Sequence, residues 1–329
     1  MSMRPMSNDT VFEKARHAGW EALGRKITFY LPGMFRCDGV TGKYPGISIT
    51  GRHCSLSCDH CGGVILNTMI SAEKPDELVR KCIQLDRKGH LGVLLSGGCT
   101  EKGELPWKRF IPAITRIKQK TNLFISVHSG LIDHETALAL KRAGVDQALI
   151  DVIGDDSTYK RVYHVPFGVN EIEKSMAALD KAKLPTVPHV VCGLNYGRIT
   201  GEEQALEMIS GFPVSQLVIV SLMNLAGTKM EKTTPPDAHH VARIIKKARA
   251  LMPKTPISLG CARERGNVLM ERLAIDAGIN RMALPSEEAL QRSKYYGLEI
   301  HYQKTCCSVP KDFSGASWND PINTTEPPK

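Results

Sequence analysis

The stretch GRHCSLSCDHCGG, residues 51–63, carries three cysteines in a C-x3-C-x2-C spacing: Cys54, Cys58 and Cys61. Three thiolates on one short loop can hold three irons of a [4Fe–4S] cube. No fourth cysteine follows nearby in the sequence, so one iron would be left without a protein ligand. The motif therefore predicts a cluster with one open iron that binds a substrate or cofactor, which a fully capped electron-transfer cluster cannot do.

Closely spaced cysteines also form structural zinc sites, and this alternative stays open at this point. Zinc knuckles usually combine a C-x2-C element with a second ligand pair of similar spacing. Here the nearby additions are His53 and His60, both inside the same loop. We expect the two histidines to shape the loop rather than to bind iron. A non-catalytic iron–sulfur or zinc protein is the competing interpretation.

Composition limits the remaining classes of protein. The chain has 329 residues, 42% of them hydrophobic, which suffices for one large α/β barrel or two ordinary domains. It contains no apolar run of membrane-spanning length and no export signal, so we expect a cytoplasmic protein without a membrane anchor. Ten cysteines in such a chain indicate metal or thiol chemistry in a reducing compartment. Because oxygen would destroy an open iron–sulfur cube, we expect that compartment to be low in oxygen.

The net charge of +9 does not by itself indicate nucleic acid, because no nucleic-acid motif is visible and aromatic residues are only 6% of the chain. Lys and Arg are dispersed along the amphipathic stretches, as is typical of solvated helix faces. A basic surface suits an acidic protein partner or an anionic substrate. We therefore expect no nucleic-acid partner.

Eight β-rich runs alternate with amphipathic helical stretches such as 107–117 and 239–252, and a further helix at about 9–24 precedes the first run. Alternating elements predict a parallel sheet, and eight units in about 240 residues fit a closed (βα)8 TIM-type barrel. A six-stranded partial barrel with an extra C-terminal domain is the alternative. The runs are 47–50, 91–95, 123–127, 147–152, 187–192, 216–222, 257–259 and 280–284.

This pattern divides the chain into three parts. Residues 1–44 form an N-terminal helix and lead-in, 45–297 form the barrel, and 298–329 form a short C-terminal extension. The last twenty residues are polar and contain proline, which predicts a loose tail.

Chemistry in such barrels takes place at the C-terminal ends of the strands. Polar, thiol and glycine residues gather at these strand ends. A barrel with a purely structural role would not need them there. Glycines let backbone groups approach a ligand closely. Asp151 and Asp155 could bind a ribose diol, or could cap the following helix instead. The strand ends carry the three-cysteine loop, Ser96-Gly97-Gly98-Cys99, Ser126-Val127-His128-Ser129-Gly130, Asp151 with Asp155, Cys192-Gly193 and Cys261-Ala262-Arg263.

With these strand ends in place, the cysteine loop resembles that of the radical S-adenosylmethionine (SAM) superfamily, and residues 45–290 are similar to its biotin synthase branch. The resemblance implies that the open iron chelates the amino and carboxylate groups of SAM. One electron then cleaves SAM to a 5′-deoxyadenosyl radical, which abstracts hydrogen from the substrate. The matching segments are Ser96-Gly97-Gly98, the run 192–202, Met223-Asn224-Leu225-Ala226-Gly227-Thr228, Ala262-Arg263-Glu264 and Ala277-Gly278-Ile279-Asn280.

The same resemblance assigns cofactor-binding roles to individual residues. Ser96, Gly97 and Gly98 lie near the methionine end of SAM, although Cys99-Thr100 replaces the acidic residue often found next to them. Asp151 lies near the ribose. His128 and Asn195 complete the implied cofactor-binding set.

Biotin synthase carries a second iron–sulfur cluster as sulfur donor, held by three strand-end cysteines and an arginine. By resemblance, Cys99 and Cys192 match two of these cysteines, while the third position falls near Ser126 or His128 and is not cysteine. We expect Cys99, Cys192 and the additional Cys261 to converge on an auxiliary cluster. The candidate ligands are Cys99, Cys192, Cys261, Arg263, Cys306 and Cys307, with His128 as a further alternative.

The opening segment 18–33 is similar to the biotin-synthase-like subunits of the two-component lipoyl synthase found in archaea and some bacteria. This resemblance implies sulfur insertion into a protein-bound octanoyl chain. The expected partners are an acidic lipoyl-carrier protein or octanoylated peptide as substrate, a second radical SAM subunit, and an electron donor such as ferredoxin or flavodoxin. The alternative retains the radical chemistry without sulfur insertion, as in rearrangement or cofactor-maturation enzymes.

Overall fold

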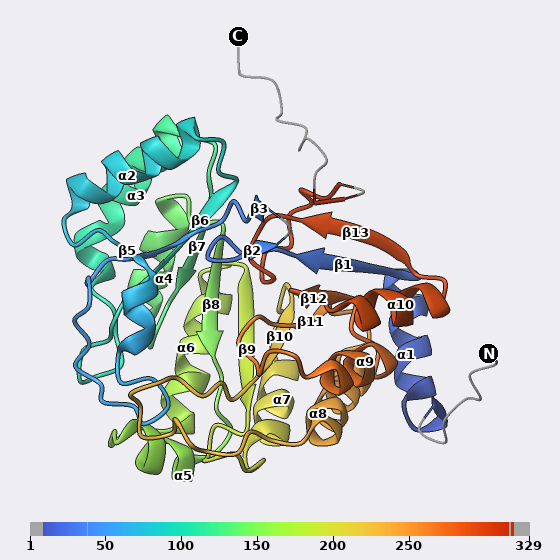
Figure 1. Cartoon of the computed structure of the whole chain (residues 1–329). Coiled ribbons are helices and arrows are strands. Elements are labelled where there is room, and N and C mark those ends of the chain that lie inside the picture. The colour runs from blue at the N-terminus through green and yellow to red at the C-terminus, as the bar shows by residue number, and fades with distance from the viewer. Residues whose placement is uncertain (1–8, 38, 316, 319–329) are drawn as a thin grey trace.

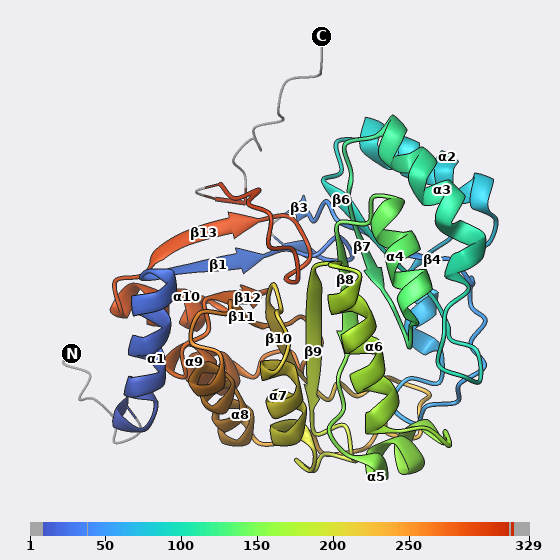
Figure 2. The same cartoon turned by 180° about the vertical axis from the view of Figure 1, so that it is seen from behind.

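A curled parallel sheet forms the centre of the molecule, and helices cover its outer face (Figures 1 and 2). The structure, a computed structural model, describes residues 9–37, 39–315 and 317–318. The eight predicted β-rich runs are confirmed as strands and follow one another around the sheet. They are β4 (Gly46–Ser48), β6 (Gly92–Ser96), β7 (Phe124–His128), β8 (Gln147–Asp151), β9 (Thr186–Cys192), β10 (Leu217–Ser221), β11 (Ile257–Leu259) and β12 (Arg281–Ala283).

The helices follow the strands as a (βα)8 TIM-type arrangement requires, so the predicted fold class is confirmed. The helices at 9–24, 107–117 and 239–252 are present as α1, α3 and α8. The α-helices are α1 (Asp9–Leu23), α2 (Pro75–Arg87), α3 (Trp107–Lys120), α4 (His134–Arg142), α5 (Asp156–Thr158), α6 (Val169–Lys181), α7 (Glu202–Ser210), α8 (Ala238–Leu251), α9 (Val268–Asp276) and α10 (Glu287–Tyr295). A 3-10 turn spans Val64–Thr68 and a π-helical turn spans Tyr159–Tyr163.

Local sequence explains where several helices begin. Asp133 accepts a hydrogen bond from the backbone N–H of Thr136 and caps α4, and Asp237 caps α8 in the same way. Ser286 caps α10 through the N–H of Ala289. Each such cap stabilises its helix by about 1 kcal/mol. The caps begin the helices immediately after the loops at the barrel mouth, where the sheet ends.

Side-chain alternation along the strands divides the core into two layers. One set of side chains packs outward against the helices, as Ile125 and Val127 of β7 do. The other set points into the barrel lumen, where a smaller cluster forms. The buried members of this lumen cluster are Tyr30, Leu149, Val187, Val218, Val220, Ala283 and Cys307.

Both chain extensions add a strand to the same sheet, which the sequence did not predict. Strand β1 (Lys26–Tyr30) pairs in parallel with β12, and β13 (Glu299–Gln303) pairs in parallel with β1. The hydrogen-bonded ladder therefore continues past β12 instead of returning directly to β4. At the far edge β5 (Ile70–Ser71) pairs with β4, while β2 (Arg36–Cys37) and β3 (Val40–Thr41) form a separate antiparallel pair. Between the segment that precedes β4 and the segment that follows β13, the N–H of Lys43 donates to the carbonyl of Lys304 at 2.6 Å.

The segment after β13, residues 304–309, closes the lumen at the N-terminal ends of the strands; we call it the plug. Gln147 donates to the carbonyl of Ser308 at 3.1 Å, and Gln216 donates to that of Cys307 at 2.5 Å. Arg281 donates to the carbonyl of Val309 at 3.0 Å. The plug thus replaces solvent at the lower end of the barrel with chain, and it carries Cys306 and Cys307 inside.

Part of the predicted tail is packed against the fold. Gly315 exchanges two backbone hydrogen bonds with Tyr302, and the rings of Tyr302 and Trp318 lie 4.9 Å apart. An aromatic ring buries enough apolar area to hold this segment. The remainder of the predicted tail, residues 319–329, lies outside the described residues.

Candidate active site

The three motif cysteines lie on the loop that follows β4. Cys58 is buried, and Cys54 and Cys61 are half-buried. The N–H groups of Cys61 and Gly62 both donate to the carbonyl of Cys58, at 3.1 and 2.8 Å. Gly62 and Gly63 adopt left-handed backbone conformations, with φ of 51° and 75°, which an L side chain would disfavour. This tight turn brings the three thiols onto one short loop.

The environment of these thiols suits a bound metal cluster. Burial raises the pKa of Cys58, and the neighbouring Cys54 and Cys61 raise it further. Burial likewise raises the pKa of Cys61, despite hydrogen bonds from the backbone of Ile65 and Gly63. Thiolates in such a place need a positive centre beside them, which is what an iron–sulfur cluster supplies. The residues present therefore fit a cluster.

Among the described residues, no group of three or more His, Cys, Asp or Glu side chains is arranged to hold a single metal ion. The choice between structural zinc and an iron–sulfur cluster at this loop rests on the family comparison below.

Gly97 and Gly98 are required by the packing of this loop. The N–H of Gly98 donates to Thr50 Oγ1 at 2.7 Å, and that hydroxyl donates to the carbonyl of His53 at 2.9 Å. A Cβ atom on Gly98 would lie 2.1 Å from the His53 carbonyl oxygen and 2.5 Å from the Cys54 Cβ. The glycines predicted from the resemblance to contact SAM thus also let the β6 end support the cluster loop.

Cys99 lies beside the cluster loop and not in the lumen. Its carbonyl accepts a hydrogen bond from the N–H of Ser55 at 2.8 Å. Burial raises the pKa of Cys99, and the nearby Cys54 raises it further.

Cys192 lies in neither group of thiols. Its side chain is completely buried in the outer layer of the core, because Val187 and His189 are the β9 residues whose parity faces the lumen. The predicted convergence of Cys99, Cys192 and Cys261 therefore does not occur.

Three other predicted thiols do come together, inside the lumen. Cys261 follows β11 and packs with Cys306 and Cys307 of the plug in the lumen cluster, close enough for the three thiols to shift one another's pKa. The neighbouring Cys307 thiol lowers the pKa of Cys306, and Ser308 Oγ donates to the Cys306 sulfur at 3.2 Å. We call Cys261, Cys306 and Cys307 the lumen thiols.

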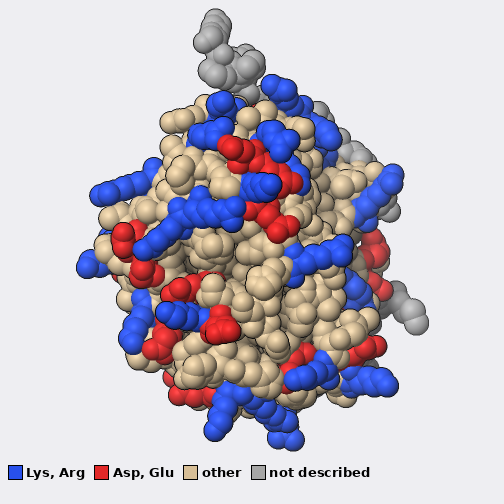
Figure 3. All heavy atoms as spheres, turned by 90° about the vertical axis from the view of Figure 1, so that its left-hand side faces the viewer, with Lys and Arg blue, Asp and Glu red and all other residues tan. Residues whose placement is uncertain are grey.

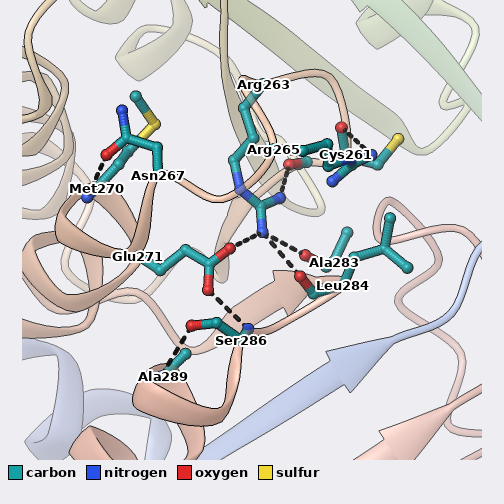
Figure 4. Close-up of polar contacts among 11 residues, drawn as sticks. Cys261, Arg263, Arg265, Asn267, Met270, Glu271, Ala283, Leu284, Ser286 and Ala289 are labelled. Atoms are coloured by element: carbon teal, nitrogen blue, oxygen red, sulfur yellow. Dashed lines mark hydrogen bonds and ion pairs between the residues drawn. The ribbon is translucent and has the colours of Figure 1, made fainter. Parts of the chain in front are cut away.

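Arg263 contacts Glu271 and backbone carbonyl groups (Figure 4). Its side chain is 1% exposed, and one terminal nitrogen pairs with Glu271 at 2.7 Å and donates to the carbonyl oxygens of Ala283 and Leu284. The other terminal nitrogen donates to the carbonyl of Gly260 at 2.6 Å. A guanidinium satisfied by protein acceptors in this way has a structural role, so the expectation that Arg263 binds an auxiliary cluster does not fit the structure.

A polar group lies in the lumen between the two sets of thiols. His128 Nε2 is 3.5 Å from Asp151 Oδ1, and the rings of His128 and His189 are 6.2 Å apart. Burial would raise the pKa of Asp151, but the two histidines outweigh it and lower the value to about 2. Burial lowers the pKa of His189 to about 4, whereas Asp151 raises that of His128 despite burial. The group therefore pairs the Asp151 carboxylate with one imidazole whose protonation it favours, His128, and lies beside a second, His189, whose protonation burial opposes.

His189 was not predicted from the sequence, although its parity with Val187 in β9 was a usable signal. Two other predicted residues are engaged with protein. Asn195 accepts a hydrogen bond from Arg161 and donates to Ser157, at 3.3 and 3.4 Å. Asp155 caps the short helix α5 through the N–H of Thr158, which is the capping alternative. His60 Nδ1 is buried and has no hydrogen-bond partner among the described residues.

Comparison with known families agrees with this geometry. The profile of the radical SAM superfamily matches residues 48–208, and that of the biotin and thiamin synthesis associated domain matches residues 213–313. The chain belongs to the radical SAM superfamily, in its biotin synthase-like branch. This radical SAM protein is 25% identical to biotin synthase of Geotalea daltonii over 235 residues, which cover 70% of the chain and 69% of the relative. It is 25% identical to biotin synthase 2 of Paracoccus denitrificans, over 76% of the chain and 77% of the relative.

Solved structures share the fold of this radical SAM protein at low sequence identity. Methylornithine synthase superposes with a TM-score of 0.62 at 15% identity, covering 91% of the chain and 90% of its own. The [FeFe]-hydrogenase maturase HydG superposes with a TM-score of 0.64 at 16% identity, covering 91% and 70%. No helix in the described part of the chain is long and apolar enough to cross a membrane.

Proposed function

We propose that this radical SAM enzyme inserts sulfur at unactivated carbon, in the synthesis of the lipoyl cofactor on a protein-bound octanoyl chain. The observation that carries the proposal is the presence of two separate groups of thiols in one barrel. One group is the loop of Cys54, Cys58 and Cys61 at the mouth, and the other is the set of lumen thiols. A radical SAM enzyme without sulfur chemistry needs only the first.

The residues divide the work between the two groups. Cys54, Cys58 and Cys61 would hold a [4Fe–4S] cluster that supplies reductive cleavage of SAM, and the lumen thiols would hold an auxiliary cluster that supplies sulfide. Ser96, Gly97 and Gly98 line the mouth beside the first group. Asp151 lies within electrostatic range of Cys61, and its partner His128 lies within range of Cys306. The pair of His128 and Asp151 therefore lies between the cysteine loop and the lumen thiols.

The barrel's own contribution is to exclude water and to orient the substrate carbon. The plug closes the lower end through hydrogen bonds from Gln147, Gln216 and Arg281. A substrate would then enter from the mouth, past the cysteine loop. A closed, dry site protects a radical from side reactions and holds the reacting atoms close together.

The proposal includes the expected partners and location. The substrate is an acidic lipoyl-carrier protein or an octanoylated peptide, and a second radical SAM subunit completes the pair of insertions. Ferredoxin or flavodoxin supplies the electron, in a cytoplasm low in oxygen. On the face seen in Figure 3, basic side chains are interspersed with acidic ones, so docking would depend on local complementarity rather than on one broad basic field.

A second candidate is a radical rearrangement or cofactor-maturation enzyme without sulfur insertion. The half-buried pair of His128 and Asp151 favours it, because polar groups in the lumen match a polar substrate better than an octanoyl chain. In this case the lumen thiols would not carry a sulfur donor.

Iron and sulfide analysis after anaerobic reconstitution tests the two candidates. The sulfur-inserting enzyme should contain about six to eight irons per chain, and the alternative about four. Incubation with SAM, reductant and an octanoylated carrier peptide should yield 5′-deoxyadenosine together with a product heavier by sulfur. A protein that contains only four irons and adds no sulfur to the peptide would support the second candidate.

A further inference from the structure

Asp59 lies inside the cysteine loop, directly after Cys58, and its buried carboxylate contacts three separate loops. Tyr196 donates to one carboxylate oxygen at 2.6 Å. His164 Nε2 lies 2.7 Å from the other oxygen, and Lys229 Nζ lies 2.8 Å from the same atom. The carboxylate side chain is 3% exposed, so both oxygens interact with protein instead of solvent.

The backbone of Asp59 joins the same neighbours. Its N–H donates to the carbonyl of Val162 at 2.8 Å, and its carbonyl accepts from the N–H of Met230 at 3.3 Å. Val162 and His164 belong to the connection after β8, Tyr196 to that after β9, and Met230 with Lys229 to that after β10. One residue of the cluster loop is therefore tied to three consecutive loops of the barrel mouth.

Two of the partners are held in costly backbone conformations. His164 and Tyr196 are not glycine, yet their φ angles are 56° and 52°. Left-handed conformations cost a residue with a Cβ roughly 1–2 kcal/mol, and they persist where surrounding contacts determine them. Arg161 supports the arrangement, because its guanidinium lies 4.6 Å from the centre of the Tyr196 ring. Such strain at two of the three side-chain partners of Asp59 is typical of a functional constraint.

Three side-chain groups from three different loops lie 2.6–2.8 Å from the carboxylate oxygens: the Tyr196 hydroxyl, His164 Nε2 and Lys229 Nζ. A contact between a carboxylate and an ammonium group such as that of Lys229 is stronger than a neutral hydrogen bond. The node formed by Asp59, His164, Tyr196 and Lys229 is consequently a firm attachment, and we call it the Asp59 node.

We infer that Asp59 is a positioning residue for the SAM-cleaving site: it orients the cysteine loop, and with it the open iron, relative to the mouth loops that surround SAM. The inference rests on the family assignment and does not depend on sulfur insertion. Ligand cysteines need such outer contacts, since a loop with two left-handed glycines has little rigidity of its own. The cysteines bind the cluster, and the Asp59 node determines the direction in which it presents its free coordination site.

The test compares Asp59→Ala and Asp59→Asn with wild type after anaerobic reconstitution. Both variants should keep the iron of the cysteine loop, because no ligand is removed. Asp59→Ala should raise KM for SAM and lower kcat for 5′-deoxyadenosine formation, by about ten-fold or more in kcat/KM. The EPR signal of the reduced cluster should respond less to SAM. Asp59→Asn keeps an acceptor for Tyr196 and should be affected less.

Matched variants separate positioning from general stability. Tyr196→Phe removes one hydroxyl from the Asp59 node and should reproduce part of the defect in a folded protein. Lys229→Ala should lower kcat/KM for SAM, whereas Lys232→Ala should not. Lys232 is exposed, belongs to the same connection, and has no charged partner among the described residues.

The outcomes distinguish the alternatives. If the Asp59 variants lose thermal stability but show wild-type KM, kcat and SAM-dependent EPR signals per loaded cluster, Asp59 has only a structural role and the inference is overturned. If wild type itself produces no 5′-deoxyadenosine, the enzymatic function fails independently of Asp59. Should Asp59→Ala fail to fold, Asp59→Asn and Tyr196→Phe decide the question by the same measurements.

Discussion

The cysteine loop and the lumen thiols contain the same type of side chain but arise in different ways. Cys54, Cys58 and Cys61 lie within eight consecutive residues, on one turn. Cys261 is far in sequence from Cys306 and Cys307, and they meet only because the plug returns into the barrel after β13. The comparison teaches that a contiguous motif can be interpreted from its spacing, whereas a site assembled by topology has no local signature.

Removing the contiguous group should have the largest effect. Serine at Cys54, Cys58 and Cys61 should abolish 5′-deoxyadenosine formation, because no other cysteine can restore three ligands on this loop. The iron held by the lumen thiols should remain. Anaerobic assay of SAM cleavage, together with iron analysis, checks this. SAM cleavage that survives the triple substitution would contradict the assignment of the loop.

Removing the lumen thiols should separate sulfur transfer from SAM cleavage. Serine at Cys261, Cys306 and Cys307 should lower the iron content from about six to eight atoms per chain to about four and stop sulfur transfer. Formation of 5′-deoxyadenosine should persist, because the cysteine loop is intact. Cys192→Ser is the control: it should keep the full iron content, since Cys192 faces the helices. Loss of the second cluster in that control would show that the lumen thiols are not its ligands.

The buried ion pair of Arg263 and Glu271 should contribute to the stability of the fold rather than bind the auxiliary cluster. Arg263→Ala leaves Glu271 buried and unpaired and should lower the free energy of unfolding by about 3–5 kcal/mol. Chemical denaturation of the apoprotein measures the loss. Any folded fraction should still bind the auxiliary iron, and an iron content reduced to that of the lumen-thiol variant would instead make Arg263 a ligand.

A smaller effect should follow from adding one methyl group beside the cysteine loop. A Cβ at Gly98 would lie 2.1 Å from the carbonyl of His53, so Gly98→Ala has to displace the loop. We expect weaker retention of the first cluster and lower SAM cleavage, by about ten-fold. Gly211→Ala is a matched control, because the new Cβ atom would lie 3.3 Å from its nearest neighbour, the Met208 carbonyl oxygen. Equal effects of the two substitutions would argue against a specific role of Gly98.

The smallest expected effect is a pH dependence of apoprotein stability from the lumen histidines. The pKa of His189 is lowered to about 4 in the folded protein, whereas in the unfolded chain the same imidazole takes up its proton at about pH 6.5. Stability from this group is thus lost as pH falls from about 6.5 to 4. His189→Gln should flatten that part of the profile in denaturant titrations. An unchanged slope would mean that His189 is not buried in neutral form.

His128 should act with the opposite sign. Its pKa is raised by Asp151, so its contribution is present below the unfolded value and is lost as pH rises through the higher folded value. Asp151→Asn should remove this loss on the alkaline side, and a persistent loss would contradict the ion pair. The two histidines can therefore be told apart in the same set of titrations.

Much of the fold could be predicted because it follows from local patterns. The eight barrel strands and the helices α1, α3 and α8 were found from short β-rich runs and helical stripes. Strands β1 and β13 were missed, because a five-residue run in a chain extension carries no sign of which sheet it joins. Their partners lie far away in sequence, and the pairing is decided by which edge of the barrel is open.

The candidate site shows the same division. His128 and Asp151 were predicted from the strand ends, and the structure places them 3.5 Å apart in the lumen, while their role in cofactor binding stays a prediction. Cys192 was misplaced because a shift of one residue along a strand exchanges the lumen for the outer core. His189 was overlooked for the same reason. The role of Asp59 could not be predicted, since its three side-chain partners come from three different loops.

By itself the sequence determined the cluster loop, the alternation of strands and helices, and hence the family. The spacing of Cys54, Cys58 and Cys61 is a covalent property of a short segment, and the alternation repeats within windows of ten to twenty residues. Only the tertiary structure decided which remaining cysteines meet, that Arg263 binds Glu271 and backbone carbonyls, and that the plug seals the lumen. These contacts join residues that are distant in the chain, and strand register together with the path of the C-terminal extension brings them together.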